Sequence, residues 1–497
     1  MPISGGCVPY GSCITRGEGA DMAVRDTAQE PELKRTLGSF QVFAISFAFI
    51  SVAVGIFASY ENLLGTAGPV GIWLWVIASI GQTLVALVVA QFAARIALSG
   101  SSYQWASRLA SPKVGWLFGW LTFWYLATGV VAMDDALSSQ ALMPMLGLPA
   151  SEDTARIITV GVLVVQAVLV IASTRLLGLI TSAAVGLELA IVVVLVLALG
   201  AVMLFTGSGT FDNLTSRGIT ANAPDYFGLG GGLMAGMLMG LLTLVGFDSA
   251  ANLAEEARDP YRSVPRAIVA SVLAASVLGL VFLVALTLAI KDIPAVSASE
   301  SPVAAIIRGQ LGSVVERITL AGLVFAMFGA GMVVMAACAR QVFAMARDGR
   351  FPAHGLMRRV HPRTQTPVPA TILIVGIGIV LMVALPGQAL LQLILGGTIL
   401  PALIYGAIVI LYLFVRKRLD VKEGGFTLGR FEMPVAIAAL VWVVAALVFL
   451  VTPGDATVPA LIVVALILAG GVYFGYLLRF HPDVLREAPA DEAQSPM

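Results

Sequence analysis

The stretch ISVAVGIFASYENLL (residues 50–64) lies inside a long apolar run, yet it carries Gly55 near its centre and a carboxylate, Glu61, near its end. A helix that served only to fill apolar surroundings would be stronger with leucine at residue 55, because glycine weakens a helix by about 1 kcal/mol relative to alanine. The glycine and the charge therefore indicate that this run has a further role.

The composition places the chain in the bilayer. Apolar residues make up 59% of the 497 and charged residues only 12%, with a mean hydropathy of +0.94, whereas soluble domains are about half apolar and a quarter charged. Runs of roughly 20 apolar residues, enough for one helical crossing, recur along the chain. We predict twelve spans, near residues 40–64, 70–97, 114–143, 157–174, 178–206, 231–254, 265–290, 317–346, 366–385, 388–415, 433–452 and 457–480.

Basic residues predict the orientation. With the N-terminus inside, all but five of the 29 Lys and Arg fall in cytoplasmic segments; the exceptions are Arg156, Arg217, Lys291, Arg308 and Arg317. Because Lys and Arg are retained on the cytoplasmic side, we expect both termini there. Residues 1–21 contain no secretory signal, and Met22 is an alternative start.

The cysteines and histidines indicate no metal or cofactor. Cys7, Cys13 and Cys338 form no CxxC motif, and the three histidines lack ligand spacing. Acidic and basic residues are equal in number, 29 each, so net charge points to no partner, and we expect no nucleic acid.

A weak internal repeat concerns the opening stretch. When VAVGIFAS (52–59) is laid over TLVGFDSA (243–250), Val54-Gly55 falls on Val245-Gly246. The two spans run in opposite directions, as in transporters built from inverted repeats. A helix break at each glycine would free backbone groups that must line a cavity, where amides suit an anion and carbonyls a cation. The alternative is that the glycines only allow close helix packing.

Two long motifs carry a family resemblance. GFDSAANLAEEARDPYRSVPRAI (246–268), and AMARDGRFP (344–352) followed by TPVPA (366–370), resemble signatures of the amino acid–polyamine–organocation transporter superfamily. VGIFASY with AGP (67–69), WLW (73–75) and SGSSYQW (99–105) is most similar to its amino acid/choline branch, which includes GABA permeases.

The resemblance implies the leucine-transporter fold, all-α, with broken first and sixth helices and alternating access. The implied units are a cytoplasmic tail (1–36), two five-helix repeats (37–206 and 207–415), two further spans (416–480) and a C-terminal tail (481–497).

The resemblance also implies a substrate site. The amides of Val54, Gly55 and Ile56 would receive a carboxylate, and the carbonyls of Val52, Leu242 and Val245 an ammonium group. Ala53, Thr243 and Gly246 complete this site. The common family pattern Gly-Ser-x-x-Gly-Ser-Gly-Ile-Phe is reduced here to its last glycine in FISVAVGIF (49–57). Ala53 and Val54 leave less room, which favours a differently shaped amine such as an ω-amino acid.

Ionisable residues inside spans are costly and therefore functional candidates. Glu188 lies ten residues into its predicted span, about 15 Å deep, where proton-coupled relatives carry a lysine. Burial favours the protonated form of a carboxylate, so we expect Glu188 to couple transport to protons. The alternative is a glutamate held by neighbouring hydroxyls.

Further charges mark the ends of the path. Asp134 and Asp135 lie roughly 30 Å along the third span, at the outer rim, where we expect Asp135 to face the path and Asp134 to be solvated. Asp248 follows the second glycine and either lines the path or bonds to freed backbone. The remaining candidates lie at the inner ends of spans six and eight, where ion pairs would close an inner gate: Glu255, Glu256, Arg340 and Arg347. The alternative is that these arginines only set topology.

The predicted function is a secondary carrier in the plasma membrane for a small-molecule amino acid or related amine such as GABA. Proton coupling is preferred, because AACAR (336–340) offers no hydroxyl for sodium; ion-independent exchange of amino acids, polyamines or choline is the alternative. No catalytic grouping or repeated filter indicates an enzyme or a channel.

Overall fold

The computed structural model describes residues 35–149, 151–207, 209–299, 301–385, 387–419, 425–453 and 456–486. Residues 1–34 of the predicted N-terminal tail, with Met22, Cys7 and Cys13, lie outside these ranges, as do residues 487–497 of the C-terminal tail. The described residues form helices and turns, with no strand among them beyond an isolated bridge between Leu37 and Ala257.

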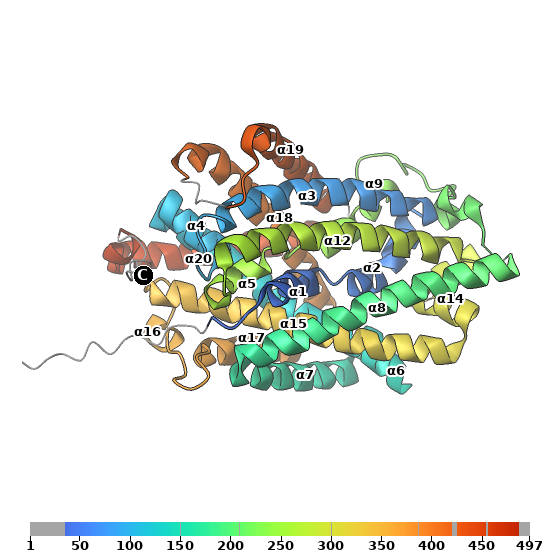
Figure 1. Cartoon of the computed structure of the whole chain (residues 1–497), viewed down its shortest axis with the longest axis horizontal. Coiled ribbons are helices and arrows are strands. Elements are labelled where there is room, and N and C mark those ends of the chain that lie inside the picture. The colour runs from blue at the N-terminus through green and yellow to red at the C-terminus, as the bar shows by residue number, and fades with distance from the viewer. Residues whose placement is uncertain are drawn as a thin grey trace, which may run out of the picture.

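The helices follow one another through a single bundle (Figure 1). Those of the first part are α1 (Ser39–Ile50), α2 (Val52–Thr66), α3 (Leu74–Ala93), α4 (Ser101–Leu109), α5 (Pro112–Ala136), a π-helical segment (Leu137–Leu142), α6 (Met143–Leu146), α7 (Glu152–Ala172) and α8 (Thr174–Thr206). Those of the second part are α9 (Gly232–Gly236), α10 (Leu238–Thr243), α11 (Ser249–Asn252), α12 (Pro260–Leu288), α13 (Ile293–Ser297), α14 (Pro302–Leu311), α15 (Ser313–Arg347), α16 (His354–Met357), α17 (Val368–Ala384), α18 (Gly387–Val415), α19 (Glu432–Val451) and α20 (Thr457–Phe480). Short 3₁₀ turns lie at Pro69–Trp73, Phe211–Leu214, Gly218–Thr220, Ala254–Glu256, Arg416–Arg418, Gly429–Phe431 and Pro482–Leu485.

The described chain has ten helical spans long and apolar enough to cross a membrane, α1 and α2 counting together as one. Two shorter apolar helical segments, Gly232–Thr243 and Val368–Ala384, fall within the predicted spans 231–254 and 366–385. The all-helical, multi-pass class is thereby confirmed, while the count of twelve crossings stays a prediction.

Close contacts through small residues hold the bundle together. α15 packs against α1, α5, α7, α8 and α17 and is buried along most of its length. α12 lies on α3, where a Cβ on Gly279 would come within 2.2 Å of the Trp75 indole. Lipid tails are as apolar as leucine, so helices in a bilayer associate by such tight packing and not by hydrophobic burial.

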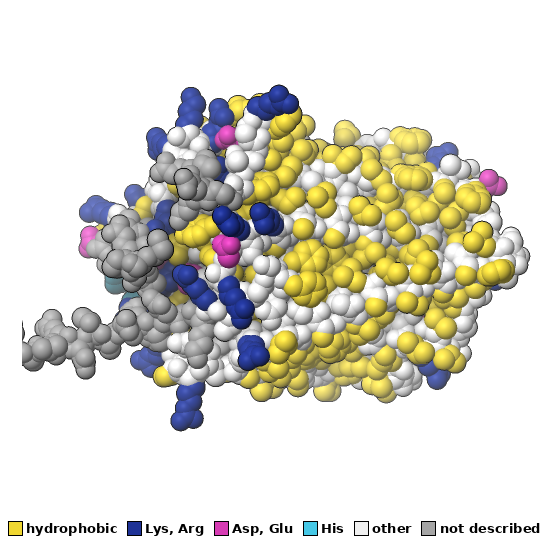
Figure 2. Space-filling view, in the orientation of Figure 1, with side chains coloured by type: hydrophobic (Ala, Val, Ile, Leu, Met, Phe, Trp, Pro, Cys, Tyr) yellow, Lys and Arg dark blue, Asp and Glu magenta, His cyan; other side chains and the backbone are white. Residues whose placement is uncertain are grey.

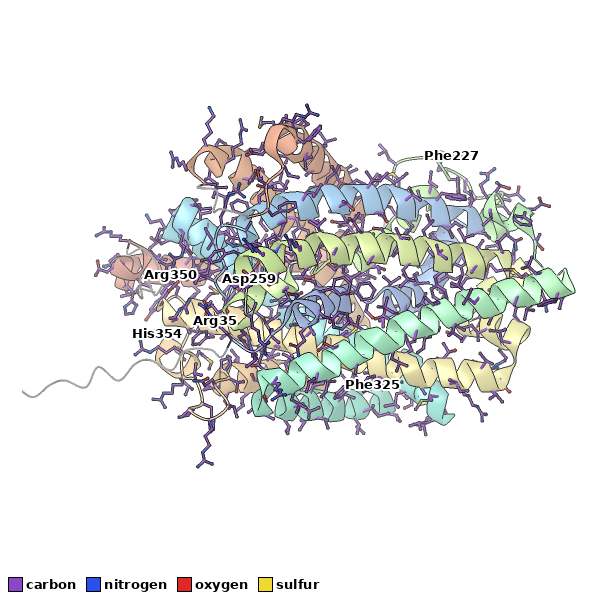
Figure 3. All side chains as sticks on the ribbon, in the orientation of Figure 1. Arg35, Phe227, Asp259, Phe325, Arg350 and His354 are labelled. Atoms are coloured by element: carbon purple, nitrogen blue, oxygen red, sulfur yellow. The ribbon has the colours of Figure 1, made fainter. Side chains whose placement is uncertain are left out.

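The surface divides into an apolar belt and a basic end (Figure 2). Exposed apolar side chains such as Val168, Leu197 and Leu468 belong to the belt expected to face lipid. Lys and Arg gather at one end, where Arg350 and His354 also lie, whereas Phe227 lies toward the other end (Figure 3). This asymmetry is the one used above to predict orientation.

Two helices are interrupted within the bundle. α1 ends at Ile50, and Ser51 adopts φ 39° and ψ 78° before α2 begins at Val52. α10 ends at Thr243, and the chain turns through Gly246, at φ 75°, before α11 begins at Ser249. The second break lies at the predicted glycine. The first lies at Ser51, four residues before Gly55, because the left-handed residue that ends α1 is the serine.

Candidate functional site

A cavity of about 330 Å³ lies between the two helix breaks. Its walls come from α1, α2, α5, α10, α15 and α18 and are mainly apolar. Five predicted site residues line it: Val54, Gly55, Leu242, Thr243 and Val245. The other four, Val52, Ala53, Ile56 and Gly246, are buried beside the breaks but are not among its lining residues.

Gly55 is required by the close approach of α2 and α10. A Cβ at residue 55 would lie 2.3 Å from Cγ2 and 2.4 Å from Oγ1 of Thr243, distances that side chains do not tolerate. The Thr243 side chain is buried, and its Oγ1 has no hydrogen-bond partner. Thr243 also lines the cavity, although its hydroxyl oxygen is itself buried against Gly55.

The amide of Gly55 is already paired, which corrects the prediction. It donates to the Ser51 carbonyl at 2.9 Å, closing the first turn of α2. The carbonyl of Val52, the first residue of α2, likewise belongs to the helical ladder. Free amides occur only in a helix's first turn, so of the three predicted amide donors only Val54 is in position. Leu242, near the end of α10, and Val245, within the break, do lie where carbonyls are freed.

Gly246 receives the aromatic ring of α1. A Cβ at residue 246 would lie 1.8 Å from the Phe49 ring, and the positive φ also favours glycine. The Gly246 amide donates to the Tyr405 hydroxyl at 3.0 Å, which in turn donates to Asp248 Oδ1 at 2.8 Å. Phe49 thereby forms part of the cavity wall against the second break.

Asp248 stabilises the second break on the side away from the cavity lining. Besides the Tyr405 hydroxyl, its carboxylate accepts a hydrogen bond from Ser101 Oγ at 3.2 Å. The residue is buried and is not among the residues that line the cavity. Its partners come from α4 and α18, which sequence periodicity does not bring together.

Glu188 contacts the first break. Its Oε1 accepts hydrogen bonds from the Ala53 amide at 2.9 Å and from Ser51 Oγ at 3.2 Å, and the residue is 2% exposed. The prediction that Glu188 lies deep in the bundle against the first span therefore agrees with the structure, and a hydroxyl does hold it. The bond to Ala53 was not predicted, because it depends on the break lying at Ser51.

The two adjacent aspartates at the end of α5 have different surroundings. Asp135 lines the central cavity and also a second cavity of about 400 Å³ that Glu152 and Arg156 share. Asp134 was expected at a solvated rim, which is wrong: it is 0% exposed, and Oδ1 accepts from Gln166 Nε2 at 2.8 Å. Adjacent helix residues point about 100° apart, so only Asp135 reaches the cavity.

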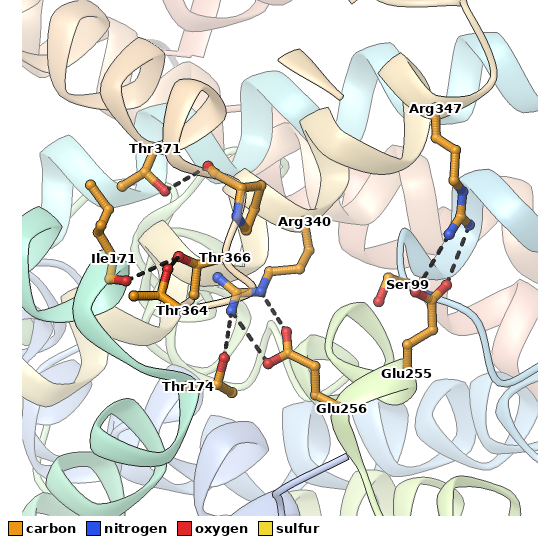
Figure 4. A network of polar contacts seen from close by, with 11 residues as sticks. Ser99, Ile171, Thr174, Glu255, Glu256, Arg340, Arg347, Thr364, Thr366 and Thr371 are labelled. Carbon is orange, nitrogen blue, oxygen red and sulfur yellow. Dashed lines mark hydrogen bonds and ion pairs between the residues drawn. The ribbon is translucent and has the colours of Figure 1, made fainter. Parts of the chain in front are cut away.

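Ion pairs connect the 3₁₀ turn Ala254–Glu256, which follows the second break, to arginines of α15 (Figure 4). Arg340 Nε lies 2.7 Å from Glu256 Oε1, with both side chains 0% exposed. Arg347 Nη2 lies 3.3 Å from Glu255 Oε1, which also accepts from the Ser99 amide at 3.0 Å. The predicted acidic pair and the α15 arginines are therefore in contact.

Leu37, near the start of the described chain, forms hydrogen bonds with the backbone on either side of Ala257. The Leu37 amide donates to the Glu256 carbonyl at 2.9 Å, and the Arg258 amide donates to the Leu37 carbonyl at 3.0 Å. Deeper in the bundle, Ser46 Oγ of α1 donates to the Phe247 carbonyl at 2.7 Å. α1 is thus bonded to the second break at Phe247, and Leu37, just before α1, is bonded to the segment that follows the break.

A multi-pass helical bundle with a ligand-sized cavity between two helix breaks is the architecture expected of a membrane transport protein. The model of the amino acid permease family matches residues 37–472. The chain belongs to this family, within the amino acid–polyamine–organocation superfamily, and is a permease and not an enzyme.

Three relatives illustrate the range of the family. The chain is 27% identical to the amino-acid permease BAT1 of Arabidopsis thaliana, over 86% of this chain and 87% of the relative. It is 27% identical to the branched-chain amino acid permease BcaP of Bacillus subtilis, over 69% of this chain and 74% of the relative. It is 25% identical to the GABA-specific permease of Saccharomyces cerevisiae, over 68% of this chain and 61% of the relative.

Proposed function

We propose that this permease is a secondary active carrier of the plasma membrane, moving an amino acid or a related amine such as GABA by alternating access. Both termini would be cytoplasmic, and residues 37–206 and 207–415 would form the two inverted halves of a leucine-transporter fold. One observation carries the proposal: the cavity lies between two helix breaks and adjoins a second cavity through Asp135, while the buried Arg340–Glu256 ion pair lies at the opposite end of the bundle.

Uptake into proteoliposomes tests this function. We expect saturable accumulation of a labelled amino acid or amine, increased by a pH gradient that is acidic outside. Equal rates of exchange with and without the gradient would favour the ion-independent exchanger of amino acids, polyamines or choline. Flux without saturation would exclude a carrier.

We further propose that Glu188 couples transport to protons. Glu188→Gln keeps a side-chain oxygen that the Ala53 amide can reach but cannot exchange a proton. We expect this variant to lose gradient-driven accumulation while exchange across the membrane continues. Glu61→Gln is the matched control, because Glu61 is an exposed carboxylate on α2. Accumulation that still follows the pH gradient in Glu188→Gln would remove Glu188 from the coupling role.

Sodium should be dispensable. The stretch 336–340 of α15 contributes no hydroxyl, and its Cys338 Sγ faces the Phe123 carbonyl at 3.9 Å, whereas sodium requires a shell of oxygen atoms. Uptake measured in sodium and in potassium or choline buffers of equal osmolarity should agree within error. A steep sodium dependence would contradict this ion assignment.

A further inference from the structure

The N-terminal part of α2 borders two cavities on different faces of the helix. Val54, Gly55 and Ala58 line the central cavity, whereas Ala53 and Phe57 line a small cavity beside Glu188. Glu188 is therefore not a lining residue of the central cavity, although its Oε1 is 2.9 Å from the Ala53 amide. Glu188 and a ligand in the central cavity would meet the same helix end from opposite sides.

No basic side chain is among the described residues that line the small cavity beside Glu188. The residues that line it are apolar except for Glu188 itself and Thr319: α12 contributes Phe282, and α15 contributes Thr319, Gly322, Leu323 and Ala326. α8 adds only Ile191, Val192 and Leu195. The described surroundings that favour a charged Glu188 are thus the Ala53 amide, the Ser51 hydroxyl and the positive end of the α2 dipole.

The central cavity has little else to offer a carboxylate. Among the described residues that line it there is no Lys, Arg or His, and the one charged side chain, Asp135, is itself acidic. The buried Thr243 hydroxyl, with no hydrogen-bond partner among the described residues, lies beside Gly55, and the Val54 amide belongs to the first turn of α2, where amides have no acceptor within the helix. A ligand carboxylate would therefore depend on the same α2 terminus that Glu188 already occupies.

We infer that Glu188 and the ligand's carboxylate are alternative anions for the N-terminus of α2, so that the protonation of Glu188 selects between ligand classes. Protonated Glu188 leaves the helix end free for a carboxylate, and the site takes a zwitterionic amino acid. Charged Glu188 neutralises the helix end and repels a second anion, and the site takes an amine without a carboxylate. This inference rests on the proposed substrate site and specifies what Glu188 does there.

Matched ligand pairs test it on the full-length purified protein. The pairs are an amino acid and the amine that lacks its carboxylate, leucine with isoamylamine and GABA with propylamine, with binding measured by thermal shift and by competition for uptake. In the wild type, we expect the affinity ratio of amino acid to amine to rise about tenfold as pH falls from roughly 8 to 5.5, the size expected for one charge at a partly buried helix terminus. In Glu188→Gln the ratio should stay high at both pH values, and in Glu61→Gln it should follow the wild type.

Two outcomes would overturn the inference without touching the transport function. An affinity ratio in the wild type that does not change with pH, with amino acid uptake intact, would show that Glu188 does not compete with the ligand. An unchanged pH response of the ratio in Glu188→Gln would assign the effect to another group. If Glu188→Gln fails to fold, a wild-type ratio that does not change with pH still overturns the inference. Failure of all four ligands to bind or be transported would instead count against the proposed function.

Discussion

Replacement of Gly55 by leucine is expected to abolish substrate binding and uptake. The new side chain would extend from the point where α2 meets α10, since even a Cβ would lie 2.3 Å from Thr243, and it would fill the cavity that both residues line. Overpacking of this kind also costs about 1–3 kcal/mol of stability, so the thermal unfolding midpoint should fall while the protein still folds. Binding by thermal shift and uptake in proteoliposomes measure the two effects separately.

The control lies on the same helix. Gly65 has nothing within 4 Å of its Cβ position, so Gly65→Leu should bind and transport as the wild type does. A second variant tests whether the contact with Thr243 causes the loss of stability. Gly55→Ala combined with Thr243→Gly places the small residue on the other side of the contact and should recover stability relative to Gly55→Ala alone. Wild-type uptake by Gly55→Leu would remove Gly55 from the site.

Removal of one member of the buried Arg340–Glu256 pair should destabilise the protein by about 3–5 kcal/mol, because the remaining charge is left in the interior without a partner. Arg340→Leu exposes this cost in the thermal unfolding midpoint of the purified protein. Arg416→Leu is the comparison, because its pair with Glu432 is 3.9 Å long with both side chains about a quarter exposed, and such pairs contribute about 0–1 kcal/mol.

The double variant Arg340→Met with Glu256→Leu tests what the pair does for transport. Apolar replacement of both partners removes the unpaired charge, so stability should return toward the wild type. Without the ion pair, this contact no longer favours a closed state at that end of the bundle, and we expect uptake to fall although folding has recovered. Full uptake by the double variant would mean that the pair only supports the fold.

Local sequence features predicted the apolar helices and the two helix breaks. They did not predict which residue forms the first break or which distant residues pack against it. The matched Val-Gly pairs correctly indicated two neighbouring breaks. They placed the first at Gly55, because helix propensity identifies a weak residue but not the residue that turns left-handed, which is Ser51. Gly55 is required by Thr243, nearly 190 residues further along the chain, and such pairings are not visible to periodicity.

Partners across the bundle were likewise outside the reach of the sequence. Asp134 and Asp135 stand next to each other in the same span, and the sequence does not tell their surroundings apart. Asp134 is buried and accepts a hydrogen bond from Gln166 on α7. The α15 arginines were expected near Glu255 and Glu256 because inner helix ends share one membrane surface, a constraint that does act at long range. Membrane topology therefore predicted the ion pairs, while side-chain direction within the bundle required coordinates.

The fastening of α1 to the second break segment has a mechanical consequence. Ser46 of α1 and Leu37, just before α1, form hydrogen bonds with backbone groups of Phe247, Glu256 and Arg258, and the Phe49 ring packs against Gly246. We therefore expect α1 and the second break to move together as one rigid unit. A movement of α1 alone would not open this end of the bundle. We expect opening at this end to break the Arg340–Glu256 and Arg347–Glu255 pairs together, so this step should be cooperative and should slow steeply on cooling.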